Sequence, residues 1–573
     1  MHYLLLATDY DGTLAHDGVV NDNTLSALDR FRASGRKLAM VTGRHLPDLC
    51  NVFPHLDLFD RVVVENGGVL YHPRSREEKL LSDPPNQRFI ELLKERKVPF
   101  SAGRTVVATW RPHDGAVLAA IRDLGLDLQV IFNKESVMVL PSGVNKGTGL
   151  HAALQELGIS AHNVVAVGDA ENDLPMFRMS GCRAAVANAL PSLKEEADLV
   201  LEKPRGEGVT NLMEFLIADD LAQFDANLQR HSISLGQKLD EAASSTGDRD
   251  LWISPRGATL LVAGPSASGK STMIAGILEQ FVDKEYQFCL IDPEGDYDAF
   301  TDALSFGNPK ETPDQKALLR ALDSPEQSAI VNLMGVALDD RAGFFSGLLP
   351  QIQDLRTRAA RPHWLIIDEA HHMLPCSWSP ANATIPQLLE STIMITVHPE
   401  HVAKAALNVV DVVVAIGNTD AISSYASIFG IQLSLGKTEI AQGEALVWFP
   451  KTGQRPVRVK APKSARERLR HVRQYAEGEL SANQSFYFRG PESKLNLRAQ
   501  NLKTFLQLAD GVDDDTWMYH LRQGDYSTWF ESIIKDQELK RQAAEIERDM
   551  NASARDSRER IRQAVEARYT APA

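Results

Sequence analysis

Two carboxylates that follow a short apolar run near the N-terminus limit what the first part of this chain can fold into. Residues 3–8, YLLLAT, are apolar without alternation, which is typical of a parallel strand buried on both faces. Asp9 and Asp11 come after this run, and Gly12 lets the chain turn away. Since open α/β sheets bind ligands at the carboxyl ends of their strands, both carboxylates are expected at a ligand site. In isolation, the segment DYDG at residues 9–12 would also suit an ordinary Asp-Gly turn.

Later segments repeat this pattern of an apolar run followed by polar or charged residues. Hydroxyl, backbone N–H and ammonium groups at strand ends can hold phosphate oxygens, and oxygen donors clustered without His or Cys suit Mg²⁺. The sequence therefore predicts a phosphate-binding, Mg²⁺-dependent site at one sheet edge. The residues concerned are Thr42 and Gly43 after residues 37–41, Lys146 after 137–140, and Asp169, Asn172 and Asp173 after 164–167.

Together, the DYDGTL, TGR, PSGVNKG and GDAENDLPMF segments resemble the four motifs of the haloacid dehalogenase (HAD) superfamily. With ENGG after residues 61–64, they are similar to the class IIB, Cof-type phosphatases. The resemblance covers roughly residues 1–215, and it implies a Rossmann-like α/β core with an α/β cap at about 78–140. Such a cap would exclude water and select the substrate.

The resemblance also implies a role for each motif residue. Asp9 would be the nucleophile that forms an aspartyl-phosphate, and Asp11 would be the general acid and base. The substrate implied is a small phosphorylated metabolite, which the sequence does not identify. The implied phosphate-binding residues are Thr42, Gly43, Lys146 and Asn172, and the implied Mg²⁺ ligands are Asp9, Asp11, Asp169 and Asp173.

A second phosphate-binding pattern occurs near the middle of the chain. Residues 259–263 predict a strand that runs directly into GPSASGKS, a GxxxxGKS pattern between a strand and a helix, which is the context of a P-loop. Lys270 would reach the β- and γ-phosphates of ATP, and Ser271 would bind Mg²⁺. The expected nucleotide-binding residues are Gly264, Pro265, Ser266, Ala267, Ser268, Gly269, Lys270, Ser271 and Thr272.

Two acids complete the expected ATP site. Residues 363–367 predict a strand that ends in Asp368, expected to support Mg²⁺, and Glu369, expected to polarise the attacking water. Residues 392–395 lead to Thr396, which could sense the γ-phosphate. These segments, with DPEGDY after residues 288–291, resemble the HerA/FtsK branch of RecA-like motor ATPases. His371 and His372 could suggest a metal, but without further ligand partners they are better interpreted as residues of a helix face.

The remaining segments carry less chemistry. Residues 216–250 are predicted to be a linker, consisting of a connecting helix and a turn, between the HAD-like domain at 1–215 and the RecA-like domain at 251–455. Residues 456–573 are predicted to form a helical C-terminal module and tail, with a basic run at 461–475 and a small aromatic core at 485–535. Charges alternate over residues 537–568 without an apolar stripe, which predicts an exposed helix.

Composition limits the class of protein. A chain of 573 residues exceeds one core and should hold roughly three or four folding units. The net charge of -15 favours solubility and disfavours a broad nucleic-acid footprint. No apolar run approaches the length that spans a bilayer, and the four cysteines are far apart, so a cytoplasmic protein with reduced thiols is expected.

The sequence therefore predicts an α/β multidomain hydrolase: a Mg²⁺-dependent phosphomonoesterase fused to an ATP-hydrolysing P-loop domain. Two alternatives remain open, a bifunctional small-metabolite kinase and phosphatase, and a nucleic-acid motor with an end-processing phosphatase. With one P-loop, the chain is expected to form a homo-oligomer, with a hexamer as the expected form, in which a neighbour supplies an arginine. The candidates are Arg320, Arg341, Arg356 and Arg358.

Overall fold

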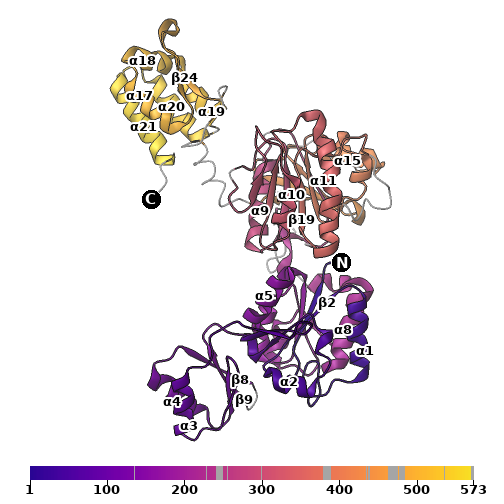
Figure 1. Cartoon of the computed structure of the whole chain (residues 1–573). Coiled ribbons are helices and arrows are strands. Elements are labelled where there is room, and N and C mark those ends of the chain that lie inside the picture. Colours follow the sequence, from indigo (N-terminus) through magenta and orange to yellow (C-terminus); the bar gives the residue numbers. More distant parts are fainter. Residues whose placement is uncertain are drawn as a thin grey trace. The chain divides into compact units, whose positions relative to one another are not determined.

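The computed structural model divides into two compact units. Figure 1 shows the helices and strands of the whole chain. The first unit contains residues 1–270, 280–295 and 302–461, and the second unit contains residues 271–279, 296–301 and 462–573. Ala267, most of the basic run, part of the predicted linker and the last four residues fall outside the described residues. The structure describes residues 1–573 except 134–135, 228, 240–248, 255, 267, 299, 379–388, 434, 436–438, 463–474, 476–479, 481–483, 535 and 570–573.

The first sheet has eight strands in the order β12-β11-β10-β1-β2-β3-β4-β5. The six strands from β12 to β3 are parallel, and β4 and β5 add an antiparallel hairpin at one edge. The predicted strands at 37–41 and 61–64 are confirmed. The bounds are β1 Leu5–Thr8, β2 Lys37–Val41, β3 Arg61–Val64, β4 Val69–His72, β5 Glu77–Leu80, β10 Val164–Gly168, β11 Cys182–Ala185 and β12 Leu199–Val200.

Helices cover this sheet, and capping residues in the sequence help to fix where they begin. The Asn21 side chain caps α1 by accepting the Thr24 N–H at 2.8 Å, and the buried Leu28 and Phe31 lie on its inner face. α1 packs against α8. The bounds are α1 Asp22–Ala33, α2 Leu46–Val52, α5 Lys146–Leu157, α6 Leu174–Arg178, α7 Pro191–Glu196 and α8 Arg205–Asp219, with short 3-10 turns η1 Leu56–Leu58, η2 Glu65–Gly67, η3 Ala161–Asn163 and η4 Glu171–Asp173.

The cap is a small α/β layer with its own core. Its four-stranded antiparallel sheet has the order β6-β7-β9-β8, and Phe89, Leu93 and Val117 are buried beneath it. The cap starts later than position 78, because β5 pairs with β4 and so belongs to the first sheet. The bounds are α3 Gln87–Glu95, β6 Ser101–Ala102, β7 Val107–Trp110, α4 Asp114–Leu124, β8 Leu128–Asn133 and β9 Ser136–Pro141.

The second sheet has eleven strands in the order β14-β13-β23-β22-β21-β15-β20-β19-β16-β18-β17. From β21 to β17 the strands are parallel, and the other four are antiparallel. The strand bounds are β13 Ile233–Lys238, β14 Asp250–Ile253, β15 Leu260–Ala263, β16 Phe288–Asp292, β17 Leu304–Phe306, β18 Ala329–Asn332, β19 Trp364–Ile367, β20 Thr392–Thr396, β21 Val412–Ile416, β22 Glu444–Trp448 and β23 Val457–Lys460. The main helices are α9 Lys270–Asp283, α10 Gln315–Leu322, α11 Leu338–Ala359, α12 Ala370–Met373, α14 Lys404–Leu407 and α15 Asp420–Phe429.

The predicted linker is wrong in part, because it contributes a strand to this second sheet. β13 pairs antiparallel with β14 and with β23. Its side chains Ile233 and Leu235 are fully buried. The apolar residues alternate with Ser234 and Gly236, and this period of two favours a strand even in a polar stretch.

Hydrogen bonds and ring contacts join the two sheets of the first unit. The His162 ring, in η3, stacks on Tyr286 with ring centroids 4.0 Å apart. Arg361, which precedes β19, donates to the Gly158 carbonyl oxygen at 2.9 Å. Burial lowers the pKa of His162 to about 4, so this ring is neutral near pH 7.

The second unit has an aromatic core in its C-terminal part, with β24 Phe486–Phe488 and β25 Leu497–Ala499 beside it. The prediction of an exposed helix at 537–568 is wrong. Leu539, Ala543 and Ile546 of α20 and Ile561 and Val565 of α21 are buried in this core. Because these residues are three or four positions apart, they form a narrow apolar stripe along each helix within a highly charged sequence. The helices are α17 Leu502–Gly511, α18 Asp514–Gln523, α19 Asp525–Ser532, α20 Gln537–Arg548 and α21 Ala554–Tyr569.

Among the described residues, no helix is both long enough and apolar enough to cross a membrane.

Replacing Ile561 by Ala should destabilise the C-terminal core by about 2–5 kcal/mol, because a fully buried side chain leaves a cavity. Limited proteolysis of the full chain, with cleavage sites identified by mass spectrometry, should show faster cutting within 485–569. Met550→Ala is the matched control, since Met550 is 76% exposed, and its cleavage rate should equal that of the wild type. Equal rates for Ile561→Ala and wild type would contradict the packing described.

Candidate functional site

A buried lysine lies between two carboxylates at the carboxyl edge of the first sheet. Lys146 Nζ donates to Asp9 Oδ1 and to Asp173 Oδ1, both at 2.6 Å. Asp9 follows β1, Lys146 begins α5 and Asp173 lies in η4, so three separate segments supply the cluster. Each of the three side chains is at most 6% exposed.

In this cluster, the buried positive charge of Lys146 and the carboxylates of Asp9 and Asp173 compensate one another. Burial raises the pKa of Asp9, and the Lys146 ammonium is the main group that opposes this. Burial would lower the pKa of Lys146, but Asp173 and Asp9 hold it above its ordinary value. Lys146 is therefore charged, and it offsets part of the negative charge that collects at the site.

The third acid of this edge is Asp169. Oxygens of Asp9, Asp169 and Asp173 lie within 4.8 Å of one another, and all three residues are buried. Gly12 provides the room for this arrangement, because a Cβ at that position would be 2.3 Å from Asp169 Oδ2. An all-oxygen donor set of this size suits Mg²⁺. Asp173 also accepts the backbone N–H groups of Asp169 and Ala170, so it holds the acidic loop as well.

Asp11 points to a different partner. Its two oxygens accept hydrogen bonds from Arg44 Nε and Nη2, both at 2.6 Å, in a bidentate pair. The Asp11 side chain is 42% exposed, unlike that of Asp9. The structure thus separates the two carboxylates of the DYDG segment into a buried one beside lysine and an accessible one beside arginine.

The remaining predicted phosphate-binding residues lie at the same edge. β1 and β2 are parallel neighbours with Thr8 opposite Met40, so Thr42 follows one residue beyond the position opposite Asp9. Thr42 is buried, and its hydroxyl accepts the Arg44 N–H at 3.2 Å. Asn172 Nδ2 lies 3.4 Å from Asn66 Oδ1, which links the last motif to the ENGG segment.

Glu65, the first residue of ENGG, links the core to the cap, a role that the sequence analysis did not assign. It reaches from the core into the cap, where its two oxygens accept the backbone N–H groups of Arg104, Thr105 and Val106 at 2.7–3.1 Å. The Thr105 hydroxyl adds a bond at 3.0 Å, and His45 Nδ1 lies 3.3 Å away. Burial would raise the Glu65 pKa, but these hydrogen bonds lower it to about 2.

The predicted nucleotide-binding segment follows β15 in the second sheet. Lys270 Nζ donates to the carbonyl oxygens of Gly264 and Pro265, both at 2.9 Å. Gly264 lies close to the end of β21, since a Cβ on Gly264 would be 2.2 Å from the Ile416 carbonyl oxygen. Lys270 is the first residue of α9, which places Ser271 and Thr272 in the first turn of that helix.

Asp368 and Glu369 follow β19 on the same edge. Asp368 is 6% exposed, and its Oδ1 accepts the Glu369 N–H at 2.9 Å. Glu369 has a positive φ of 43°, and its Oε2 lies 3.3 Å from His371 Nδ1. The same His371 nitrogen is 3.0 Å from the Thr396 hydroxyl. His371 thus contacts both Glu369, expected to polarise the attacking water, and Thr396, expected to sense the γ-phosphate. The sequence analysis did not predict these contacts.

Arg341, Arg356 and Arg358, among the four candidate arginines, each make contacts within their own chain, and those of Arg356 are the most extensive. Arg356 donates to the carbonyl oxygens of Pro362, Glu390 and Ser391 at 2.6–3.3 Å. Breaking these contacts would leave the carbonyl oxygens of the buried residues Pro362 and Ser391 without this donor, so Arg356 is a poor donor for a neighbouring chain.

Glu65→Gln should loosen the cap, because an amide presents an N–H group where Glu65 accepts backbone N–H groups. The pKa lies below its ordinary value of 4.5, so the stabilisation is full above that pH and is lost as the pH falls toward 2. We expect a loss on the order of 3 kcal/mol at pH 7, measured by hydrogen exchange at the amides of residues 104–106.

Glu78→Gln is the matched control, since Glu78 forms an exposed pair with Arg104 and should contribute less than about 1 kcal/mol. The difference in protection between Glu65→Gln and wild type should shrink between pH 4.5 and pH 2. A difference that stays constant over this range would show that the Glu65 carboxylate does not hold the cap.

Comparison with known proteins places this site in a family. A family model for haloacid dehalogenase-like hydrolases matches residues 6–112 and 121–213. Phosphoglycolate phosphatase 2 of Saccharolobus solfataricus is 30% identical over 226 residues, which are 38% of this chain and 95% of that protein. Phosphoglycolate phosphatase of Methanothermobacter thermautotrophicus is 34% identical over 213 residues, 36% of this chain and 94% of that protein.

Among solved structures, a haloacid dehalogenase-like hydrolase from Bacteroides thetaiotaomicron matches 37% of this chain and 99% of its own, with 20% identity and a TM-score of 0.33. The curated relatives are matched over nearly their whole length by little more than a third of this chain. Through its N-terminal part, the chain therefore belongs to the haloacid dehalogenase-like hydrolases.

Proposed function

We propose that the first sheet and its cap form a Mg²⁺-dependent phosphomonoesterase that works through an aspartyl-phosphate. The observation that carries this proposal is the buried Lys146 between Asp9 and Asp173, with Asp169 at the same edge. A buried, charge-compensated carboxylate beside an accessible one is the arrangement that nucleophilic attack and proton transfer require.

In the first step, an Asp9 carboxylate oxygen attacks phosphorus, the ester P–O bond breaks, and Asp11 donates a proton to the leaving oxygen. In the second step, Asp11 takes a proton from water, the water oxygen attacks phosphorus, and the bond to Asp9 breaks. Lys146 holds Asp9 in place and offsets charge on the phosphoryl group throughout. Asp9, Asp169 and the Asp11 carbonyl would hold Mg²⁺, with Asp173 in support, and the ion would neutralise the charge of the attacked phosphate.

Arg44 favours a small substrate with a second anionic group. Its guanidinium lies beside Asp11 and is 29% exposed, so it can also receive a carboxylate that enters with the phosphate. Two relatives that match this part of the chain are named phosphoglycolate phosphatases. We therefore propose phosphoglycolate, or a similarly small acidic phosphate ester, as the first substrate to test.

Asp9→Asn should abolish phosphate release, because an amide cannot form the aspartyl-phosphate. Phosphate release from phosphoglycolate and a panel of phosphate esters should fall at least about 10³-fold, and ATP hydrolysis by the same preparation should persist. Asp17→Asn is the control, since it makes the same chemical change at a side chain that is 92% exposed. Release by Asp9→Asn above a few per cent of wild type would contradict the assignment of the nucleophile.

We propose further that the second sheet is a RecA-like, ATP-hydrolysing P-loop domain. Support comes from the strand order, since β20 lies between β15, which precedes GPSASGKS, and β19, which precedes Asp368 and Glu369. Thr396 at the end of β20 pairs with Ala263 at the end of β15. The parallel register thus supports one shared edge for the phosphate loop, the sensor hydroxyl and the two acids.

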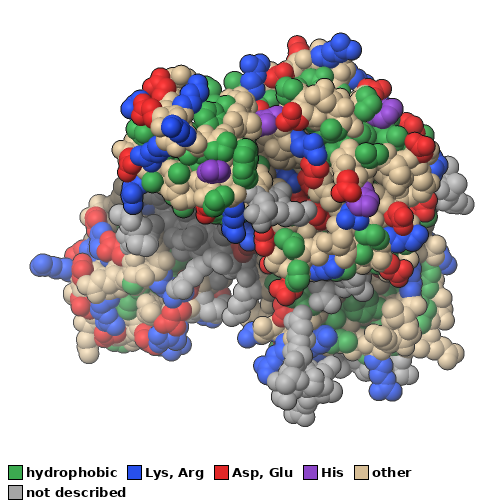
Figure 2. Space-filling view, turned by 90° about the horizontal axis from the view of Figure 1, so that it is seen from below, with side chains coloured by type: hydrophobic (Ala, Val, Ile, Leu, Met, Phe, Trp, Pro, Cys, Tyr) green, Lys and Arg blue, Asp and Glu red, His purple; other side chains and the backbone are tan. Residues whose placement is uncertain are grey.

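The position of Glu369 favours hydrolysis over the kinase alternative. An acid beside Asp368, held by His371, suits the polarisation of water, whereas a kinase has to protect its phosphoryl group from water. For the nucleic-acid alternative, charge distribution gives little support. On the face shown in Figure 2, Lys and Arg side chains are interspersed with Asp and Glu. The net charge of -15 points the same way.

We include in this proposal a homo-oligomer, with a hexamer as the expected form. One P-loop in the chain leaves the γ-phosphate without an arginine from a second RecA-like core, so a neighbouring copy would supply it. Arg320, Arg341 and Arg358 remain the candidates, of which Arg341 Nε donates to the Val336 carbonyl oxygen at 3.2 Å and Arg358 pairs with Asp354 at 2.9 Å.

Lys270→Ala and Glu369→Gln should fail differently. Lys270 would compensate the phosphate charge, so its loss should weaken ATP binding at least about tenfold. Glu369 would act only in the hydrolytic step, so the Glu369→Gln variant should bind ATP as the wild type does but hydrolyse it slowly. Binding of a fluorescent ATP analogue and phosphate release from ATP measure the two effects, with the exposed Lys310→Ala as control. Equal loss of binding in both variants would rule out Glu369 as the group that activates water.

A further inference from the structure

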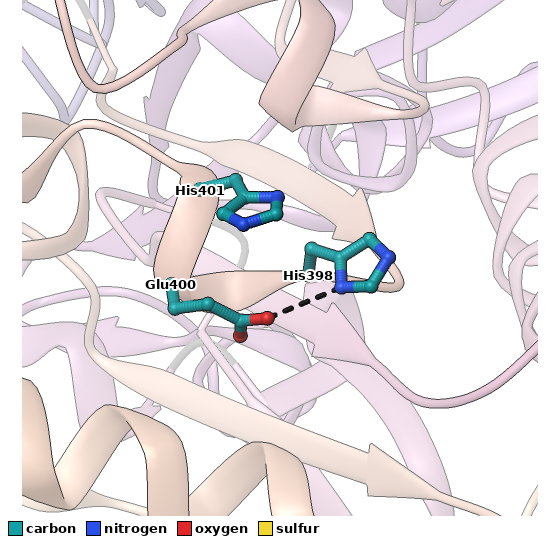
Figure 3. A group of neighbouring side chains, drawn as sticks. All are labelled: His398, Glu400 and His401. Carbon is teal, nitrogen blue, oxygen red and sulfur yellow. Dashed lines mark hydrogen bonds and ion pairs between the residues drawn. The ribbon is translucent and has the colours of Figure 1, made fainter.

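We propose that the turn after β20 is a binding site for a Zn²⁺-class divalent ion. Its ligands are the side chains of His398, Glu400 and His401, shown in Figure 3. One potential ligand atom from each residue lies within 4.8 Å of the others. This cluster is separate from the acidic cluster of the first sheet, which contains oxygen donors alone.

The geometry brings three donors to one side of a single turn. His398 Nδ1 and a Glu400 oxygen are 3.1 Å apart, and the two imidazole centroids are 5.0 Å apart. Around a tetrahedral Zn²⁺ with bonds near 2.0 Å, ligand atoms are separated by roughly 3.3 Å. The ligand atoms of the three residues, which here lie within 4.8 Å of one another, can reach the spacing around Zn²⁺ through small side-chain rotations, because all three side chains are exposed.

The backbone that carries these side chains is fixed. The turn η7, Pro399–His401, is closed by the His401 N–H, which donates to the His398 carbonyl oxygen at 3.0 Å. The His398 N–H donates to the Thr396 hydroxyl, and the Cys376 thiol donates to the Glu400 carbonyl oxygen at 3.4 Å. A rigid backbone beneath adjustable side chains lowers the entropy that ion binding has to overcome.

The donor set determines the kind of ion. Two imidazoles and one carboxylate suit Zn²⁺, Co²⁺ and Ni²⁺, whereas Mg²⁺ prefers oxygen ligands. Three protein ligands leave a fourth position for water, so the site would be open rather than closed. The partners that the sequence analysis did not find for a metal are therefore present, but they lie around His398 rather than His371 and His372.

The site is linked to the candidate ATP site by direct contacts. The Thr396 hydroxyl accepts from His398 N–H at 3.0 Å and lies 3.0 Å from His371 Nδ1, which is 3.3 Å from Glu369. Ion binding at His398 would therefore restrain the residue that would sense the γ-phosphate. This consequence for ATP hydrolysis rests on the proposed function, but ion binding itself does not.

Isothermal titration with Zn²⁺ tests the site in the full, untagged chain, with Mg²⁺ in excess to occupy the all-oxygen cluster. We expect one Zn²⁺ per chain, and a loss of affinity of at least about tenfold in His398→Ala and in His401→Ala. Co²⁺ should give a visible absorption band that both variants lose. His372→Ala is the matched control, since it removes a nearby imidazole that is not among the three ligands, and it should bind as wild type does.

Equal Zn²⁺ affinity in wild type and in the double variant His398→Ala/His401→Ala would overturn the proposal. Loss of binding in Asp169→Asn, with the two histidine variants unaffected, would assign the ion to the acidic cluster and would overturn it as well. Circular dichroism of each variant establishes that it is folded. If binding follows the expected pattern and ATP hydrolysis is absent in every protein, the ion site stands and the ATPase proposal fails.

Discussion

The first sheet depends on placing a charged lysine where water does not reach. Lys146 is 1% exposed, and its ammonium group donates to the carboxylates of Asp9 and Asp173. Removing either acid would leave a buried charge with incomplete compensation, a change that commonly costs several kcal/mol. In the proposed reaction, the same contacts would also hold Asp9 toward the substrate phosphate. Stability and the proposed chemistry would therefore depend on one set of contacts. Gly12 leaves room for Asp169 at the same edge, because a Cβ at position 12 would be 2.3 Å from Asp169 Oδ2.

The second sheet places its polar groups by the same geometric rule but with a different balance of charge. Parallel strands deliver Lys270, Asp368 and Thr396 to one edge, yet Lys270 is bound by backbone carbonyl oxygens rather than by carboxylates. Carbonyl dipoles hold an ammonium group less strongly than ionised acids do, so under the proposed function an arriving phosphate would displace them. In the two proposed sites, Lys270 would thus be available to an anionic ligand, whereas Lys146 would orient a nucleophile.

Sequence reasoning succeeded where the signal was local. The buried strands β2 and β3 are continuous apolar runs, and their polar ends identify the sheet edge. It failed where the contacting residues are far apart in the sequence, or where a helix or strand has few apolar residues to reveal its periodicity. Glu65 contacts backbone groups 39 to 41 positions later, which no local pattern encodes. In α20, three buried residues among charged ones were too few to reveal a stripe. In β13, serine and glycine masked the alternation of Ile233 and Leu235.

Regular elements connect the two candidate sites within the first unit. α5 begins at Lys146 and spans about 18 Å by the rise of an α-helix. Gly158, the residue after it, accepts a hydrogen bond from Arg361, and β19 then leads to Asp368. Arg361 is 1% exposed and also donates to the Leu322 and Asp323 carbonyl oxygens. Because each buried donor needs its acceptor, sliding at this junction would break several hydrogen bonds at once. The phosphatase helix and the acidic strand are thus joined by a specific contact, and not only by the intervening chain.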